Sequence, residues 1–163
     1  MKLVMEIPAE TKMTEGLSIL LSKTYAAYLK TAEFHWNTSG YFFGEFRNVL
    51  EEQYAELAAA VPGIAERIQE LGFRSPENYE EFSRLAEFPD SKEFFDAAEM
   101  IQSLVRDHEE ILRIARIALT AATQAMDRAS EELIRSRVYE HEKFVWMLKN
   151  LIFEIPVSCK KYF

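Results

Sequence analysis

Apolar side chains recur at steps of three and four residues through most of the chain, which is the spacing of one face of an α-helix. Between residues 13 and 37 this face carries Leu17, Leu20, Leu21, Tyr25, Tyr28, Leu29 and Ala32. Between residues 42 and 71 it carries Val49, Leu50, Leu57, Ile64, Ile68 and Leu71. The pattern predicts two long helices, separated by the turn residues 38–40 and closed by Gly72.

The second half of the chain continues in the same way. Ser75 and Pro76 suit the cap and the first position of a helix, so a short helix is predicted over residues 77–86. Asp90 followed by Glu93 resembles a capping box, which predicts a third long helix from there to about residue 125. Its apolar face carries Phe94, Ala98, Ile101, Leu104, Val105, Ile111, Ile114 and Ile117. Asp127 is expected to cap a fourth helix, which Pro156 would end near residue 154.

Four long helices with few alternating stretches predict an all-α four-helix bundle. The short helix would lie in the connection between the second and third long helices. A length of 163 residues suits a single domain over 1–163, with tails at about 1–12 and 156–163. Pro62 and Gly63 fall inside the second helix, where a kink or a bulge is expected rather than an end.

Composition narrows the class of protein. Hydrophobic residues make up 48%, which argues against disorder, and a formal net charge of −8 disfavours a basic nucleic-acid binder. The single cysteine, Cys159, excludes an intrachain disulfide framework and a Cys-rich zinc site. It is interpreted as an incidental thiol, with crosslinking or metal capture as the alternative. No apolar run reaches the ~18 residues of a spanning helix, and the start does not resemble a signal peptide, so a soluble, cytoplasmic protein is expected.

Common catalytic motifs are missing from the sequence. The three histidines form neither HExxH nor an E-x-x-H pair, and there is no Gly-rich phosphate loop or GxSxG elbow. His108 and His141 stand among acidic residues in the segments DHEE and EHEK. Both are expected at helical surface or interface positions.

Three segments point to a known family: FHWNTSGYFF at 34–43, AERIQELG at 65–72 and HEKFVWML at 141–148. In their order and spacing, these segments make the chain resemble the Dps family of mini-ferritins. The resemblance implies a ferritin-like bundle assembled as a hollow shell of twelve subunits. It also implies oxidation of Fe(II), usually with hydrogen peroxide, and storage of ferric mineral. The family's ferroxidase site lies between two subunits related by a two-fold axis. One subunit gives two histidines and often a carboxylate, and the other gives an Asp and a Glu.

This sequence departs from the family pattern at the ferroxidase site. The resemblance places the first histidine ligand on His35, the accessory carboxylate on Glu51 and the ligand Glu on Glu66. The second histidine position is Arg47 and the ligand Asp position is Pro62. A guanidinium is a permanent cation without a lone pair to donate, and proline has no side-chain donor atom. We therefore expect iron binding at this site to be weak or absent.

The substitution of Arg47 suggests a different pairing. Positions 47, 51, 62 and 66 lie within about 100° of one another around an ideal helix, so they share one face. We hypothesise that Arg47 takes the vacated metal position and pairs with the partner subunit's Glu66. Bonding of Arg47 to water or to a local carboxylate, and residual metal binding, stay open as alternatives.

Two further predictions follow from the resemblance. Asp127 and Glu131, one turn apart, are explained by helix capping, but acidic residues near this position line iron-entry pores in the family. The family's DNA-binding members use lysine-rich tails. Here Lys2 and Lys12 stand among three glutamates, and the C-terminal lysines 160 and 161 form only a small patch. DNA binding is therefore not expected, and the implied partners are further copies of the chain.

Three functions remain open from the sequence. The first is a shell that sequesters or stores iron and protects against oxidative stress, with a degenerate ferroxidase site. The second is an active ferroxidase rearranged around His35, Glu51 and Glu66. The third is a non-enzymatic protein that keeps the bundle for assembly or partner binding.

Overall fold

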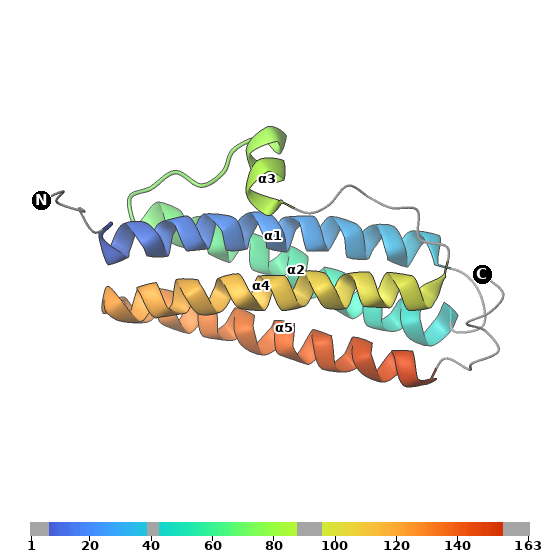
Figure 1. The fold of residues 1–163 in the computed structure, drawn as a ribbon. Coiled ribbons are helices and arrows are strands. Elements are labelled where there is room, and N and C mark those ends of the chain that lie inside the picture. The colour runs from blue at the N-terminus through green and yellow to red at the C-terminus, as the bar shows by residue number, and fades with distance from the viewer. Residues whose placement is uncertain (1–6, 39–42, 88–95, 155–163) are drawn as a thin grey trace, which may run out of the picture.

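The computed structural model describes residues 7–38, 43–87 and 96–154. Its helices are α1 (Ala9–Asn37), α2 (Phe43–Glu70), α3 (Tyr79–Ala86), α4 (Ala97–Gln124) and α5 (Arg128–Glu154). The four long helices run side by side along one axis, and α3 lies outside them against α1 (Figure 1). This arrangement confirms the predicted all-α four-helix bundle with its short extra helix. None of the described helices combines the length and the apolar character needed to cross a membrane.

The first helix begins four residues earlier than predicted. Its apolar face starts at Met13, but the polar turn before it is also helical and follows Pro8. Glu10 lies in this first turn, where a carboxylate suits the positive end of the helix dipole. Residues 9–12, predicted as part of a tail, therefore belong to α1.

Two other helix starts differ from the prediction. Asn78 caps α3, because its Oδ1 accepts a hydrogen bond from the amide of Glu81 at 2.9 Å, so residues 75–77 belong to the connection. Asp96 caps α4 in the same way, and its Oδ1 accepts from the amide of Glu99 at 2.7 Å. The predicted capping residues 90 and 93, and Phe94, lie outside the described residues.

Two other predicted boundaries are confirmed, while Ser39, Gly40 and Pro156 lie outside the described residues. Gly72 ends α2 in the left-handed region at φ 82°, and its amide donates to the Gln69 carbonyl. Asp127 caps α5, since its Oδ1 accepts from the amide of Ser130 at 3.1 Å. Helix α2 continues through Pro62, as expected from the helical sequence on both sides.

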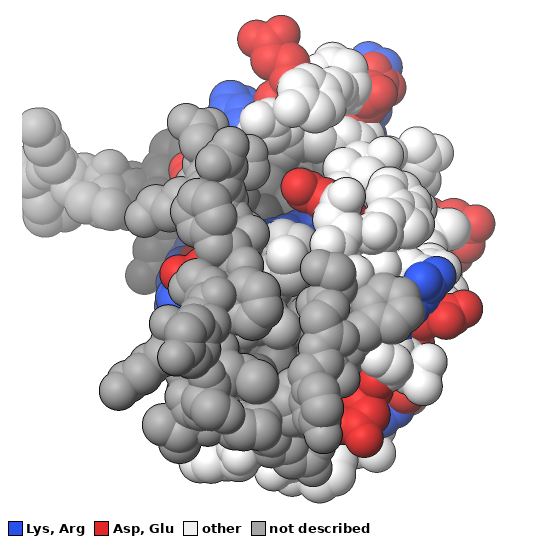
Figure 2. All heavy atoms as spheres, turned by 90° about the vertical axis from the view of Figure 1, so that its right-hand side faces the viewer, with Lys and Arg blue, Asp and Glu red and all other residues white. Residues whose placement is uncertain are grey.

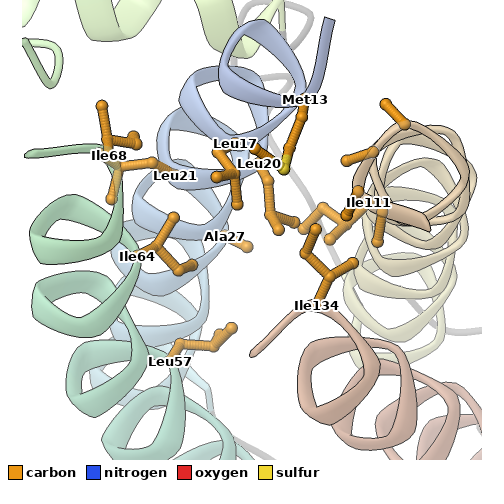
Figure 3. Close-up of a cluster of buried hydrophobic side chains, with 14 of the residues drawn as sticks. Met13, Leu17, Leu20, Leu21, Ala27, Leu57, Ile64, Ile68, Ile111 and Ile134 are labelled. Atoms are coloured by element: carbon orange, nitrogen blue, oxygen red, sulfur yellow. The ribbon is translucent and has the colours of Figure 1, made fainter. Parts of the chain in front are cut away.

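The core is formed by one face of each long helix. In Figure 3, Leu17, Leu20 and Leu21 of α1 lie among apolar side chains of the other three long helices. These include Ile64, Ile68, Ile111 and Ile134. Helices α1 and α4 pack closely at Gly16, where an added Cβ would lie 2.8 Å from the Cβ of Ala118. Ile117, which the periodicity placed on the apolar face, is 56% exposed, while its neighbour Ala118 takes the buried position.

Candidate functional site

His35 lies near the C-terminal end of α1 and is buried. Arg47 lies in the first turns of α2. The Nε–H of Arg47 donates a hydrogen bond to Nε2 of His35 at 3.2 Å. The twelve-residue spacing that the resemblance gives to a pair of metal ligands is thus used here for contact between an imidazole and a guanidinium.

This hydrogen bond decides the tautomer of His35. Because Nε2 accepts from Arg47, it carries the ring's lone pair, and in the neutral ring the proton is on Nδ1. Nδ1 is buried and has no hydrogen-bond partner among the described residues. A metal ion would need the Nε2 lone pair, which Arg47 already uses, and its charge would stand beside a fixed cation. This geometry opposes metal binding while Arg47 stays in place.

Glu51 extends the cluster towards solvent. Its Oε2 lies 3.8 Å from Nε2 of His35, and its side chain is 60% exposed. The ring of Tyr54 packs edge-on against His35 with the centroids 5.1 Å apart. We refer to His35, Arg47 and Glu51 as the His35 half-site.

Pro62 and Glu66 lie far from that half-site within one chain. Both are on α2 and exposed, and Glu66 has no hydrogen-bond or ion-pair partner among the described residues. Glu66 lines a shallow surface pocket with Ala65, Gln69, Glu70 and Ser75. Fifteen residues separate it from Glu51, which is about 22 Å along a helix at ~1.5 Å per residue. One chain therefore presents two separate half-sites, and one ion can contact both only with a second copy of the chain.

Asp127 has a structural role in this chain. Its carboxylate accepts hydrogen bonds from Arg67 at 2.7 and 2.9 Å, and from the hydroxyl and the amide of Ser130. These bonds link the end of α2 to the start of α5. Burial acts to raise the pKa of Asp127, but the hydrogen bonds from Ser130 and Arg67 outweigh it and hold the pKa below its usual value. Glu131 is mostly buried and lies 3.8 Å from Arg135. The capping role of Asp127 is thus observed, and the pore stays a prediction about the assembly.

The prediction for His108 and His141 is wrong. Both are 0% exposed, and their Nδ1 atoms lie 2.9 Å apart between α4 and α5. Their acidic neighbours in the sequence suggested a surface position. The helical period gave the opposite signal, because Ile134 and Leu148 lie seven residues on either side of His141 and are also fully buried.

Charge at the surface is mixed. On the described part of the end view in Figure 2, acidic and basic side chains lie along the outer rim and form no single basic patch. The described residues also contain no group of three or more His, Cys, Asp or Glu side chains placed to hold a metal ion. The described part of one chain therefore offers no complete metal site, and its part of the face in Figure 2 has no basic patch.

Comparison with known proteins gives one consistent result. A family model for the ferritin-like domain matches residues 14–156. A low temperature-induced protein of Nostoc sp. (strain PCC 7120) is 29% identical over 140 residues, which are 85% of this chain and 78% of the relative. The DNA protection during starvation protein of Brevibacillus brevis is 27% identical over 147 residues, covering 88% and 99%. The solved Dps structure of Vibrio cholerae O1, a ferritin-like diiron-carboxylate protein, matches with a TM-score of 0.82 at 28% identity, over 88% and 91%.

Proposed function

Because this chain belongs to the ferritin-like family, and within it to the Dps proteins, we propose that it forms a hollow shell that sequesters iron with a degenerate ferroxidase site. Iron is the cargo of such a shell, and its removal from solution protects the cell from peroxide chemistry. Family membership supports the iron-related role. The departure at the ferroxidase site is supported by this chain's own residues.

The observation that carries the proposal is the hydrogen bond from Arg47 to His35. It occupies the lone pair of His35 Nε2, and it brings a permanent positive charge to that point. Even when a second subunit brings the half-sites together, only two carboxylates, Glu51 and Glu66, remain, because Arg47 and Pro62 supply no ligand atom. Oxidation of iron at this site is therefore expected to be slow compared with a site that has two histidines, an Asp and a Glu.

The proposed assembly brings the two half-sites together. In a two-fold pair of subunits, the partner subunit's Glu66 would face Arg47. A guanidinium has five N–H donors, so Arg47 can bind a carboxylate in addition to His35. The exposed Glu66 lacks a partner within the described part of its own chain, which supports this pairing. The charge pair would replace the metal as the bridge across the interface.

An active ferroxidase rearranged around His35, Glu51 and Glu66 is the second candidate. The distance of 3.8 Å between Glu51 Oε2 and His35 Nε2 favours it, because a small outward movement of Arg47 would leave an imidazole and a carboxylate adjacent. Three nitrogen and oxygen ligands completed by water are a reasonable iron environment. This candidate predicts bound metal next to His35, whereas the degenerate site predicts none.

Assembly and iron retention test the proposal together. The purified protein is measured by native mass spectrometry, loaded with Fe(II) and peroxide, desalted, and assayed for iron per particle against a protein-free control. We expect a closed shell of twelve subunits that retains iron, with no retardation of duplex DNA in a gel. A shell that retains no iron would favour the non-enzymatic structural role, and a monomer or simple dimer would contradict the shell.

A further inference from the structure

The middle of the bundle contains polar side chains that the candidate site does not use. Gln53 of α2, His108 of α4 and His141 of α5 are 0% exposed, and so is Thr24 of α1. Each long helix thus contributes one of these side chains. In these four residues, the buried atoms without a hydrogen-bond partner among the described residues are Thr24 Oγ1, both amide atoms of Gln53, and Nε2 of His108 and of His141. We call these four residues the central polar layer.

Ion pairs at the edges of the bundle place α2 and α5 in register. Glu52 pairs with Lys143 at 2.8 Å, and Glu56 accepts from Arg137 at 3.1 Å. Gln53 lies between the two glutamates on α2. His141 lies between the two cations on α5. The Gln53 amide is therefore level with the His141 ring.

The same argument aligns α1 with α4. Lys30 donates to Asp107 at 2.6 Å, and the Lys23 ammonium lies 3.7 Å from Glu110. Thr24 lies between the two lysines. His108 lies between the two acidic residues and contacts His141 directly. His108 therefore lies at the level of His141 and Gln53, while Thr24, next to Lys23, lies nearer the level of Glu110.

The hydrogen bond between the two imidazoles determines which Nε2 atom can donate a hydrogen bond to a ligand and which can accept one. A hydrogen bond between two Nδ1 atoms needs the proton on one ring and the lone pair on the other. In the neutral pair, the ring that donates from Nδ1 has a lone pair on Nε2, and the other ring has an Nε2–H. The pair thus presents one acceptor and one donor to the core. Gln53 adds a second acceptor and two more donors.

We propose that the central polar layer binds at least one internal water molecule, which links the Gln53 amide to an Nε2 atom of the His108–His141 pair. A water molecule has two donors and two acceptors, which match this mixed set. Buried polar atoms are almost always hydrogen-bonded, and these atoms have no partner among the described residues. A metal ion suits the layer less well, since only one of the two Nε2 atoms has a lone pair.

The state of the histidines is measurable because the chain contains only three. Assembled protein labelled with 15N-histidine is examined by magic-angle-spinning NMR at pH 7. For His108 and His141 we expect one ring protonated at Nε2 and the other at Nδ1. His35→Asn, which removes the third ring, should leave these two opposite tautomers. Identical tautomers for His108 and His141, or a positive charge on either of these two rings, would overturn the proposal.

The bound molecule itself is identified by crystallography of the assembled protein with data collected above and below metal absorption edges. We expect a peak without anomalous signal at hydrogen-bond distance from the Gln53 amide and an imidazole Nε2. Gln53→Met, which roughly keeps the volume, should lose the peak, while the exposed control Gln69→Met should retain it. A metal ion at the peak, or a Gln53 amide bonded directly to protein atoms with no peak, would overturn the proposal. If Gln53→Met does not fold, the crystal structure of the unmodified protein and the histidine tautomers from NMR still test the proposal.

Discussion

The Nε–H of Arg47 donates to Nε2 of His35 at 3.2 Å, so the end of α1 is linked to the start of α2 by a guanidinium and an imidazole. Both residues stand where the family resemblance expects histidine ligands. The lone pair that would bind iron is used within the chain, and the added charge is permanent. The chemistry of the site therefore depends on whether Arg47 stays in this position when the subunits assemble.

We predict that the close packing of α1 on α4 requires glycine at position 16. Gly16→Ala would place a Cβ 2.8 Å from that of Ala118, and this overlap should cost about 1–3 kcal/mol in spite of the better helix propensity of alanine. The exposed Gly44, with no atom near its added Cβ, is the matched control, and Gly44→Ala should stabilise slightly. Urea unfolding followed by circular dichroism compares them. Ala118→Gly should restore the stability of Gly16→Ala, and a missing rescue would contradict the proposed contact.

Lys23 is predicted to hold α3 against the bundle. Its ammonium is buried and donates to the Ala86 carbonyl at 2.6 Å, at the C-terminal end of α3 where a cation is favourable. Lys23→Met removes this bond, so α3 should detach more often and trypsin should cleave faster after Arg84. The exposed Lys12→Met on the same helix serves as the control. Equal cleavage rates in the two variants would show that α3 is held by its apolar contacts alone.

Asp127 is predicted to stabilise the start of α5 and its contact with α2. Asp127→Ala should lower the free energy of unfolding by about 1–2 kcal/mol, because it removes the cap and the partner of Arg67. The pKa of Asp127 is held below its usual value of 3.8 in the folded chain, so its contribution is complete above that pH and is lost as pH falls through the folded pKa. Glu132→Ala, an exposed carboxylate on the same turn, should have little effect. Similar losses for both variants would exclude the capping account.

The buried histidine pair predicts a loss of stability in mild acid. Burial, with repulsion from Lys30, lowers the pKa of His108 to about 3, and burial, with repulsion from His108 and Arg137, lowers the pKa of His141 well below 6.5. The unfolded chain takes up these protons near pH 6.5 and the folded chain does not. Stability should therefore fall as pH drops from about 6.5 towards 3, by up to about 1.4 kcal/mol per pH unit for each histidine.

The variant His108→Leu/His141→Leu provides the test of this acid sensitivity. Without the two imidazoles, the pH dependence between 6.5 and 4 should become flatter, whatever the change in absolute stability. His35→Asn is the control, because it removes a histidine outside the pair. An unchanged slope in the double variant would mean that other groups cause the acid sensitivity.

The sequence predicted the helices well because their apolar residues repeat with the helical period over many turns. Two helix starts differ from the prediction, because several polar residues near each start have the side chain of a cap. The choice of Asn78 and Asp96 depends on which side chain reaches an amide in the folded chain. Residues such as Ser75 and Pro76 have the same local preference but lie in the connection.

The site was predictable in part. The resemblance identified His35 and Arg47, but the bond between their side chains depends on how α1 and α2 pack against each other in the folded chain. The pairing of His108 and His141 could have been suspected from their buried neighbours at helical spacing. Polar residues are usually assigned to the surface, and the acidic residues around both histidines strengthened that assignment. Contacts between elements distant in sequence need the fold itself.

The rate of iron oxidation by the assembled protein tests the degenerate site most directly. Fe(II) is added anaerobically at about one ion per subunit, hydrogen peroxide is mixed in, and the ferric absorbance is followed by stopped flow. We predict that the unmodified protein stays close to the protein-free rate, and that Arg47→His/Pro62→Asp is clearly faster because it restores two ligands. Rapid oxidation by the unmodified protein that saturates with the number of subunits would contradict this account and identify an active, rearranged ferroxidase.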